Sequence, residues 1–189
     1  MTEPQFYPDP WPETFRFMQV AWVVDDILGM ARRFVSLYGA GPFHVMKPRK
    51  SHMSYRGESV EPIVQIAVAQ MGPVQVELIQ QHCDTETIYT RELRAINGVH
   101  HLCTFQPDYD AAHRHYARHD CRLIAEITMP SGKRVGYFDT LGDLGVITEV
   151  VEEDPGLRSA LNGIAATCRD WDGSDPIRLL TRDGYEIPA

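Results

Sequence analysis

Residues 98–105, Gly-Val-His-His-Leu-Cys-Thr-Phe, decide the fold, because they form an apolar, strand-like stretch with a polar side chain on its apolar face. β-Branched and aromatic residues favour strands, and successive side chains point to opposite faces of a strand. His101 therefore shares a face with Cys103 and Phe105. A polar group in such a place is costly unless it has a partner, so we expect His101 to meet other polar groups.

Three further strand-like segments each carry one polar residue in the same kind of setting. They are residues 17–24 with Gln19, residues 74–79 with Glu77, and residues 145–151 with Glu149. An ionised carboxylate on an apolar face costs several kcal/mol unless it is paired or bound to a cation. Taken together, the four residues predict a site for one divalent metal ion.

The order of predicted elements repeats along the chain. Apolar side chains at spacings of three and four predict helices, and short apolar runs between Gly or Pro predict strands. The first copy has a strand at 17–24, a helix at 25–38, and strands at 43–46, 63–71 and 74–79. The second copy has a strand at 100–105, a helix at 109–119, and strands at 122–129, 134–139 and 146–151.

The polar residues obey this repeat. Gln19 and His101 lie 82 residues apart on the first strand of each copy, and Glu77 and Glu149 lie 72 apart on the last strand. The predicted fold class is α+β, with two βαβββ modules that form a curved mixed sheet around a metal cleft. We expect an N-terminal tail at 1–15, modules at 16–94 and 95–154, and a C-terminal helix at 155–169 followed by an irregular tail to 189.

Composition narrows the classes of function. The chain has 189 residues, 43% of them hydrophobic, and a net charge of −8 with 18 scattered basic residues, which argues against nucleic acid as a partner. It contains no apolar run of the ~18 residues that a membrane span needs, and no apolar signal segment at its start. The four cysteines lack a Cys-x-x-Cys spacing. We expect a cytoplasmic protein with reduced thiols and no membrane partner.

Four local motifs, in this order, resemble the vicinal oxygen chelate superfamily, which includes glyoxalase I, methylmalonyl-CoA epimerase, extradiol dioxygenases and bleomycin-resistance proteins. The motifs are Gln19-Val-Ala-Trp-Val-Val-Asp-Asp, Val76-Glu77-Leu-Ile, Gly98-Val-His-His101-Leu and Gly145-Val-Ile-Thr-Glu149-Val-Val-Glu. The resemblance covers roughly residues 16–152. It implies that these four polar residues are metal ligands, and that the protein forms a homodimer.

One imidazole, two carboxylates and an amide oxygen suit Zn, Co, Ni, Mn or Mg with open positions for substrate oxygens. The resemblance implies a metal-dependent isomerase, epimerase or lyase of the glyoxalase type, which transfers a proton alpha to a metal-chelated carbonyl. The partner would be a small carbonyl compound, with an acyl-CoA as one candidate. Glu149 would be both ligand and base. Glu61, with Glu58 as its alternative, would act on the opposite face, as the second Glu of methylmalonyl-CoA epimerases does.

Other interpretations stay open. A ring-cleaving dioxygenase would need redox-active iron and a second histidine, whereas a non-catalytic binding or resistance protein would need no metal ligands. His101 alone could be a core histidine, Glu149 a solvated strand end, and Glu61 an exposed loop carboxylate. His44, which follows the Gly41-Pro42-Phe43 turn, is a candidate for the cleft wall. Tyr89 and Arg91 are further candidate substrate contacts, since arginine recognises carboxylate or phosphate.

Overall fold

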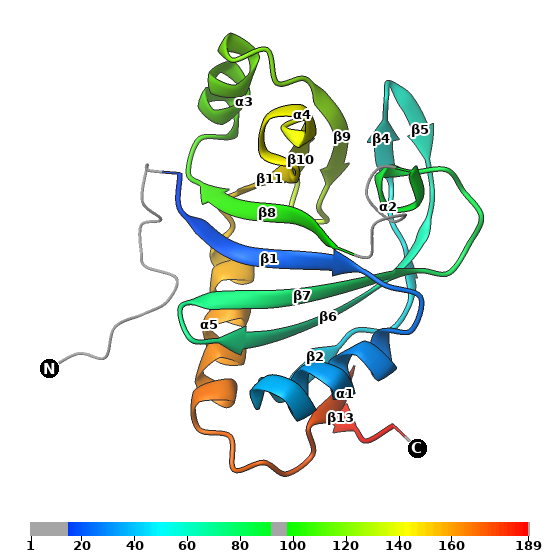
Figure 1. Cartoon of the computed structure of the whole chain (residues 1–189), viewed down its shortest axis with the longest axis vertical. Helices are drawn as coiled ribbons and strands as arrows, with labels where there is room; N and C mark the ends of the chain where they lie inside the picture. The colour runs from blue at the N-terminus through cyan, green and yellow to red at the C-terminus, as the bar shows by residue number, and fades with distance from the viewer. Residues whose placement is uncertain (1–14, 92–97, 189) are drawn as a thin grey trace, which may run out of the picture.

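The computed structural model describes residues 15–91 and 98–188, apart from the side chain of Arg91 (Figure 1). Its strands are β1 (Phe17–Val23), β2 (Phe43–Val45), β3 (Arg49–Lys50), β4 (Met53–Tyr55), β5 (Glu58–Val60), β6 (Ile63–Met71), β7 (Val74–Gln81), β8 (Val99–Gln106), β9 (Leu123–Thr128), β10 (Arg134–Phe138), β11 (Ile147–Glu152), β12 (Ile177–Thr181) and β13 (Gly184–Glu186). Its helices are α1 (Ile27–Tyr38), α2 (Ile88–Arg91), α3 (Tyr109–Arg118), α4 (Leu141–Leu144) and α5 (Pro155–Arg169).

All strands belong to one curved mixed sheet, which confirms the predicted fold class. The first βαβββ unit contributes the order β2-β6-β7-β1, and the second contributes β8-β11-β10-β9. Each unit pairs its first strand in parallel with its last strand, β1 with β7 and β8 with β11. The two units join through the antiparallel pairing of β1 with β8, which Figure 1 shows at the centre of the sheet.

The two units have the same register as well as the same strand order. In the first, Ala21 lies opposite Glu77, and in the second, Cys103 lies opposite Glu149. Across the junction, Ala21 lies opposite His101. Residues that are equivalent in the sequence repeat therefore occupy equivalent positions in the two units. The polar residues lie on the four strands at the junction of the units, β7, β1, β8 and β11.

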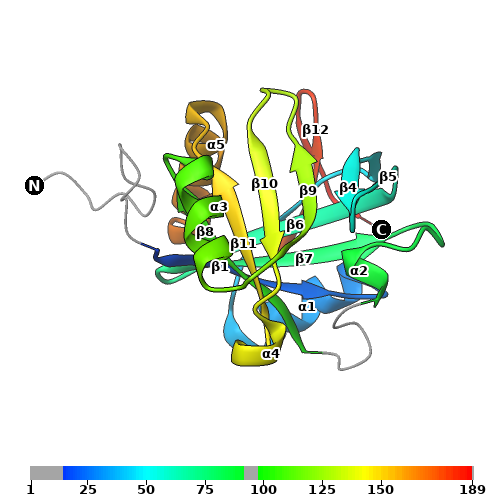
Figure 2. The same ribbon diagram turned by 90° about the horizontal axis from the view of Figure 1, so that it is seen from above.

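The sheet separates two apolar layers. On β6, Val64, Ile66 and Val68 line the concave side, whereas Ala67 and Ala69 pack under α1 on the convex side. Helix α5 packs against β6 from the concave side (Figure 1). Helix α3 covers the convex side of the second unit, beside β11 (Figure 2). Because side chains alternate along a strand, the even-numbered residues of β7 and β11 build the convex core and the odd-numbered residues face the cleft.

Three helices begin at an aspartate that accepts a hydrogen bond from a backbone amide three residues later. These N-caps are Asp26 of α1, Asp108 of α3 and Asp154 of α5. A cap of this kind stabilises a helix by about 1 kcal/mol, because it satisfies an amide that has no partner within the helix. The predicted starts of all three helices agree with the structure to within two residues.

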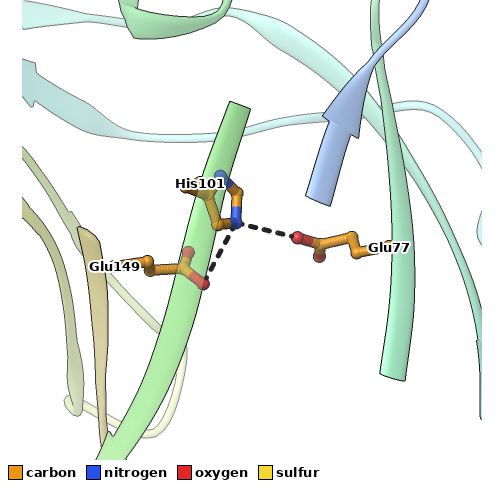
Figure 3. Close-up of side chains that lie close together, drawn as sticks. All are labelled: Glu77, His101 and Glu149. Atoms are coloured by element: carbon orange, nitrogen blue, oxygen red, sulfur yellow. Dashed lines mark ion pairs between the residues drawn. The ribbon is translucent and has the colours of Figure 1, made fainter. Parts of the chain in front are cut away.

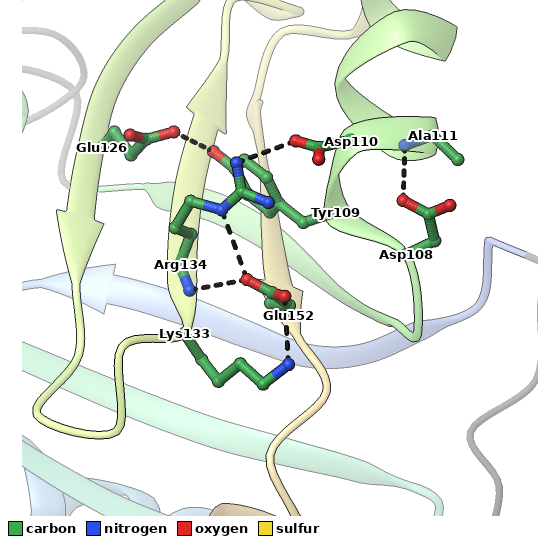
Figure 4. Close-up of polar contacts among 8 residues, drawn as sticks. All are labelled: Asp108, Tyr109, Asp110, Ala111, Glu126, Lys133, Arg134 and Glu152. Carbon is green, nitrogen blue, oxygen red and sulfur yellow. Dashed lines mark hydrogen bonds and ion pairs between the residues drawn. The ribbon is translucent and has the colours of Figure 1, made fainter.

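A polar network fastens α3 to the second unit (Figure 4). The hydroxyl of Tyr109 donates to Glu126 on β9 at 2.7 Å, and the guanidinium of Arg134 lies over the Tyr109 ring at 4.3 Å. Arg134 also donates to Asp110 at 2.8 Å and to Glu152 at 3.3 Å. One arginine on β10 therefore connects the first turn of α3 with β11, which carries Glu149.

Two strand pairs lie outside the predicted repeat. The hairpin β4–β5, between β2 and β6, reaches across to pair with β9 of the second unit. The segment expected to be an irregular tail forms β12 and β13, and β12 pairs in parallel with β2. The two turn residues between β12 and β13 are Arg182 and Asp183, and the Asp183-Gly184 pair is a hairpin signal that the sequence-based prediction did not use. Among the described residues, no helix combines the length and apolarity that crossing a bilayer requires.

We predict that Gly136→Ala lowers the free energy of unfolding by about 1–3 kcal/mol, because the core beneath α3 has no room for another carbon. A Cβ at this position of β10 would lie 2.0 Å from the Tyr109 hydroxyl oxygen. Urea denaturation measures the change. Tyr109→Phe should recover part of the loss in the double variant, and a Gly136→Ala protein of full stability would contradict this packing.

Candidate metal centre

Three side chains from three strands converge inside the cleft (Figure 3). The Nε2 atom of His101 on β8 lies 3.2 Å from Glu77 Oε2 on β7 and 3.3 Å from Glu149 Oε2 on β11. The donor atoms of all three lie within 4.8 Å of one another, and none of the residues is more than 8% exposed. The His101 Nε2 atom has no hydrogen bond of good geometry, although it lies between two carboxylates.

A chain of hydrogen bonds sets the orientation of His101. The Nε2 of His100 lies 3.0 Å from the carbonyl oxygen of Ile88, which can only accept, so this nitrogen carries a proton. Burial, followed by the charge of His101, lowers the pKa of His100 to about 3, so the ring is neutral and its Nδ1 must accept. The partner at 2.9 Å is Nδ1 of His101, which therefore donates. This arrangement directs His101 Nε2 at the two carboxylates.

A β-bulge makes this chain of bonds possible. Adjacent residues of a regular strand point to opposite faces, so His100 and His101 could not face each other. Along the β1–β8 pair, Ala21 lies opposite His101 and Trp22 lies opposite Val99, which leaves His100 as the extra residue. Bulges commonly redirect a side chain beside a functional site.

Burial and neighbouring charges shift the pKa values of the cluster residues in opposite directions. Burial alone would lower the pKa of His101, but Glu149 and Glu77 raise it to about 9. Burial raises the pKa of Glu77. Burial also acts upward on the pKa of Glu149, but His101, Cys103 and Tyr137 outweigh it and lower that pKa. Without a metal ion, one imidazolium faces two carboxylates.

These residues fit a divalent cation. Replacing the proton on His101 Nε2 by a doubly charged ion would balance the two carboxylates, and imidazole with carboxylates suits several divalent metals. Gln19 lies in the wall of the same cavity as Glu77 and Glu149. Its side-chain amide nitrogen donates to Gln75 Oε1 at 2.6 Å, which leaves its own amide oxygen as the atom available to a cation.

Glu77 and Glu149 of the cluster line an apolar cavity of about 220 Å³ on the concave side of the sheet. The lining comes from both units and from α5, whose contribution is Leu157, Ala160, Leu161 and Ile164. Among the described lining residues, Arg49 is the only lysine or arginine. Tyr89 and Tyr137 also line the cavity. Their hydroxyl oxygens lie 2.8 Å apart.

The remaining predicted site residues lie in different places. Glu61 is not among the residues that line the cavity, and it lies in the short link between β5 and β6. Its carboxylate is about half exposed and pairs with His52 at 2.8 Å and Lys50 at 3.7 Å, which does not support a role at the cluster. His44 is buried on β2 but is not part of the lining. The side chain of Arg91 lies outside the described residues.

A family model of the Glyoxalase/Bleomycin resistance protein/Dioxygenase superfamily matches residues 18–137. The chain belongs to this superfamily. The superfamily's name joins glyoxalases, bleomycin-resistance proteins and dioxygenases, and one fold can carry several functions, so membership leaves the reaction open. No curated protein matches the chain significantly.

Solved structures share the fold of this chain. A hypothetical protein from Bacillus halodurans C-125 is 15% identical with a TM-score of 0.53, over 75% of this chain and 96% of that one. Methylmalonyl-CoA epimerase from Mycobacterium tuberculosis is 17% identical with a TM-score of 0.52, over 75% of this chain and 90% of that one. At such identities the likeness concerns the fold alone.

Sequence reasoning missed His100, Gln75 and Tyr137, which contact the predicted ligands. The His100-His101 doublet was a signal for the first, but only the bulge turns His100 toward its neighbour. Gln75 precedes Glu77 on the same face of β7, so alternation could have found it. Tyr137 lies directly opposite Glu149 on β10, a register that the sequence does not give.

We predict that His100→Leu weakens binding of a divalent metal about 10–100-fold, because His101 loses the acceptor that orients its ring. His113→Leu on α3, away from the cluster, is the control. Metal content after dialysis and metal titration measure the effect, with His101→Ala expected to lose the ion entirely. Native affinity in His100→Leu would show that the doublet does not position the ligand.

We also predict that metal binding releases about one proton at neutral pH, because the ion must displace the proton on His101. With a His101 pKa of about 9 in the metal-free protein, affinity should rise as pH increases and level off above that pH. Below it, the rise should be about tenfold per pH unit. Calorimetry in buffers of different ionisation enthalpy counts the proton, and a pH-independent affinity would contradict the prediction.

Proposed function

We propose that this protein is a metal-dependent enzyme that moves a proton at the carbon alpha to a carbonyl group, as an isomerase, epimerase or lyase of the glyoxalase type. One observation carries the proposal. Glu77 and Glu149 line an apolar cavity, and His101 Nε2 is turned toward both carboxylates. A bound divalent ion would polarise the carbonyl oxygen and stabilise the negative charge that proton removal creates.

Glu149 is the proposed base. Its pKa is lowered, so it is ionised at neutral pH, and it lies in the wall of the cavity. Tyr137, opposite Glu149 on β10, and Cys103, opposite it on β8, both favour its ionised form and lower its pKa. A base within reach of the substrate carbon contributes about 10²–10⁴-fold to the rate of proton transfer.

Glu77 is the group that faces Glu149 from the other side of His101 (Figure 3). These two are the only carboxylates among the described residues that line the cavity. Burial raises the pKa of Glu77, whereas the pKa of Glu149 is lowered. We therefore assign to Glu77, and not to the exposed Glu61, the return of a proton on the opposite side.

The cavity supports an apolar substrate. Most of its described lining is aliphatic or aromatic, and the polar side chains gather at the cluster and near Arg49. An acyl group attached to a carrier such as coenzyme A remains one candidate, and a compact carbonyl compound is another. The homodimer predicted from the sequence remains a proposal.

We predict that the metal-loaded protein exchanges alpha-carbon hydrogens of a suitable carbonyl compound with deuterium from heavy water. The test uses a panel of acyl-CoA thioesters and 2-hydroxy carbonyl compounds, followed by mass spectrometry. Glu149→Gln should slow exchange about 10²–10⁴-fold, because an amide cannot accept the proton. Metal content must be measured in the same sample, so that loss of the ion is not mistaken for loss of the base.

Glu61→Gln is the matched control, since this substitution removes an exposed carboxylate outside the cavity. It should exchange at the native rate. A large loss of exchange rate in Glu61→Gln would show that Glu61 takes part in proton transfer. Exchange at the native rate by Glu149→Gln would show that Glu149 is not the base. A protein that binds the panel tightly in its metal-free form without any exchange would instead be a binding protein.

A further inference from the structure

We propose that Lys47, Arg49 and Arg182 form an anion subsite at the mouth of the cavity, which holds an acidic group of the substrate while its apolar body fills the cavity. These three residues are referred to below as the basic groove. The inference names the substrate class and rests on the proposed function. It predicts an amphipathic carbonyl compound with an anionic end.

The basic groove is built by the C-terminal part of the chain. Strand β12 pairs in parallel with β2, with Leu179 opposite Val45. The residues that follow each strand therefore run side by side, and Arg182 comes to lie near Lys47. The groove measures about 380 Å³ and is lined by Met46, Lys47, Pro48, Arg49, Leu180, Thr181 and Arg182. Strand β12 lies outside both βαβββ units and extends the sheet beyond β2.

The groove and the cavity share two wall residues, Met46 and Arg49. The backbone amide of Met46 donates to the carbonyl of Ile66 at 2.8 Å, which fixes Met46 beside a strand that lines the cavity. Arg49 lies opposite Val64, another lining residue. A ligand that fills the cavity can therefore place one end in the groove.

The charges of the groove lack internal partners. Lys47, Arg49 and Arg182 are exposed, and among the described residues none of their side chains forms an ion pair or hydrogen bond. Other cations of the chain are paired, such as Lys133 with Glu152 and Arg134 with Asp110. Asp183, in the turn after Arg182, is the acidic residue next to the groove in sequence.

Three gathered cations favour an anionic ligand, particularly in a chain whose net charge is −8. Two are arginines, whose planar guanidinium groups bind carboxylate or phosphate through paired hydrogen bonds. In the proposed function, the metal centre binds the carbonyl oxygen of the substrate, and the aliphatic lining of the cavity contacts its apolar body. The basic groove would bind a third part of the same molecule, its acidic group.

The test uses two fluorescent probes with one aromatic framework, 1-anilinonaphthalene-8-sulfonate and the uncharged 1-anilinonaphthalene. Both should bind in the cavity, and only the first has an anion for the groove. The double variant Arg49→Gln/Arg182→Gln should weaken sulfonate binding about tenfold, as expected for the loss of a charge-assisted contact. Its affinity for the uncharged probe should change less than about twofold.

Two further variants complete the test. Arg122→Gln removes an exposed arginine far from the groove in sequence and should leave both affinities unchanged. Ile164→Trp on α5 should fill the cavity and weaken both probes equally, with thermal unfolding as the check on its fold. Equal loss of both probes in the double variant, unchanged sulfonate binding, or no binding by the native protein would each overturn the proposal.

Displacement of the bound sulfonate identifies the natural anion. Octanoate and octanoyl-CoA share an apolar chain but carry a carboxylate and carrier phosphates, respectively. If octanoyl-CoA displaces the probe more strongly and loses this advantage in Lys47→Gln/Arg182→Gln, the natural anion is phosphate. If octanoate displaces it more strongly and loses this advantage in Arg49→Gln/Arg182→Gln, the natural anion is carboxylate. Displacement by neither compound would overturn the substrate class. None of these measurements needs turnover, so failure of the deuterium exchange would count against the proposed function alone.

Discussion

The antiparallel pairing of β1 with β8 is the constraint on which the rest of the structure depends. Each βαβββ unit has only a shallow half of a cleft, and its polar residues would face solvent if the unit stood alone. The pairing sets the first strands of both units side by side, with the last strands flanking them. His101, Glu77 and Glu149 meet because they lie on three of these four strands.

The buried cluster places one histidine between two carboxylates, and the histidine is held from behind. An isolated buried carboxylate is costly, and two together repel each other. His101 lies between them, and its far side is fixed through His100 to the carbonyl of Ile88. This support depends on one extra residue in β8. The bulge is thus a local irregularity of the sheet that orients the central side chain of the site.

The additions to the repeat shape the ligand space. Helix α5 supplies four apolar side chains to the cavity, and β12 brings Arg182 beside the loop after β2. The hairpin β4–β5 connects the first unit to the far edge of the second. The two βαβββ units therefore provide the residues of the candidate metal centre, while segments outside the repeat line part of the cavity and the basic groove.

Much of the scaffold could be read from the sequence, because short-range patterns determine it. Alternation along residues 98–105 assigned His101 to one face with Cys103 and Phe105, and apolar side chains at spacings of three and four predicted the helices. The repeat then predicted that four distant residues would gather. The hairpin around Tyr55 and the strand that begins at Ile177 were not predicted, because each is short and is stabilised by pairing with a strand distant in sequence.

The sequence by itself determined the module order, the apolar faces and which polar residues face the cleft, because these follow from periodicity along the chain. Only the tertiary structure decided that Glu61 lies outside, that His100 turns toward His101, and that Tyr137 touches Glu149. These features depend on cross-strand register, a bulge and the course of a hairpin. Such properties are set by contacts between segments far apart in the chain, and no local pattern encodes them.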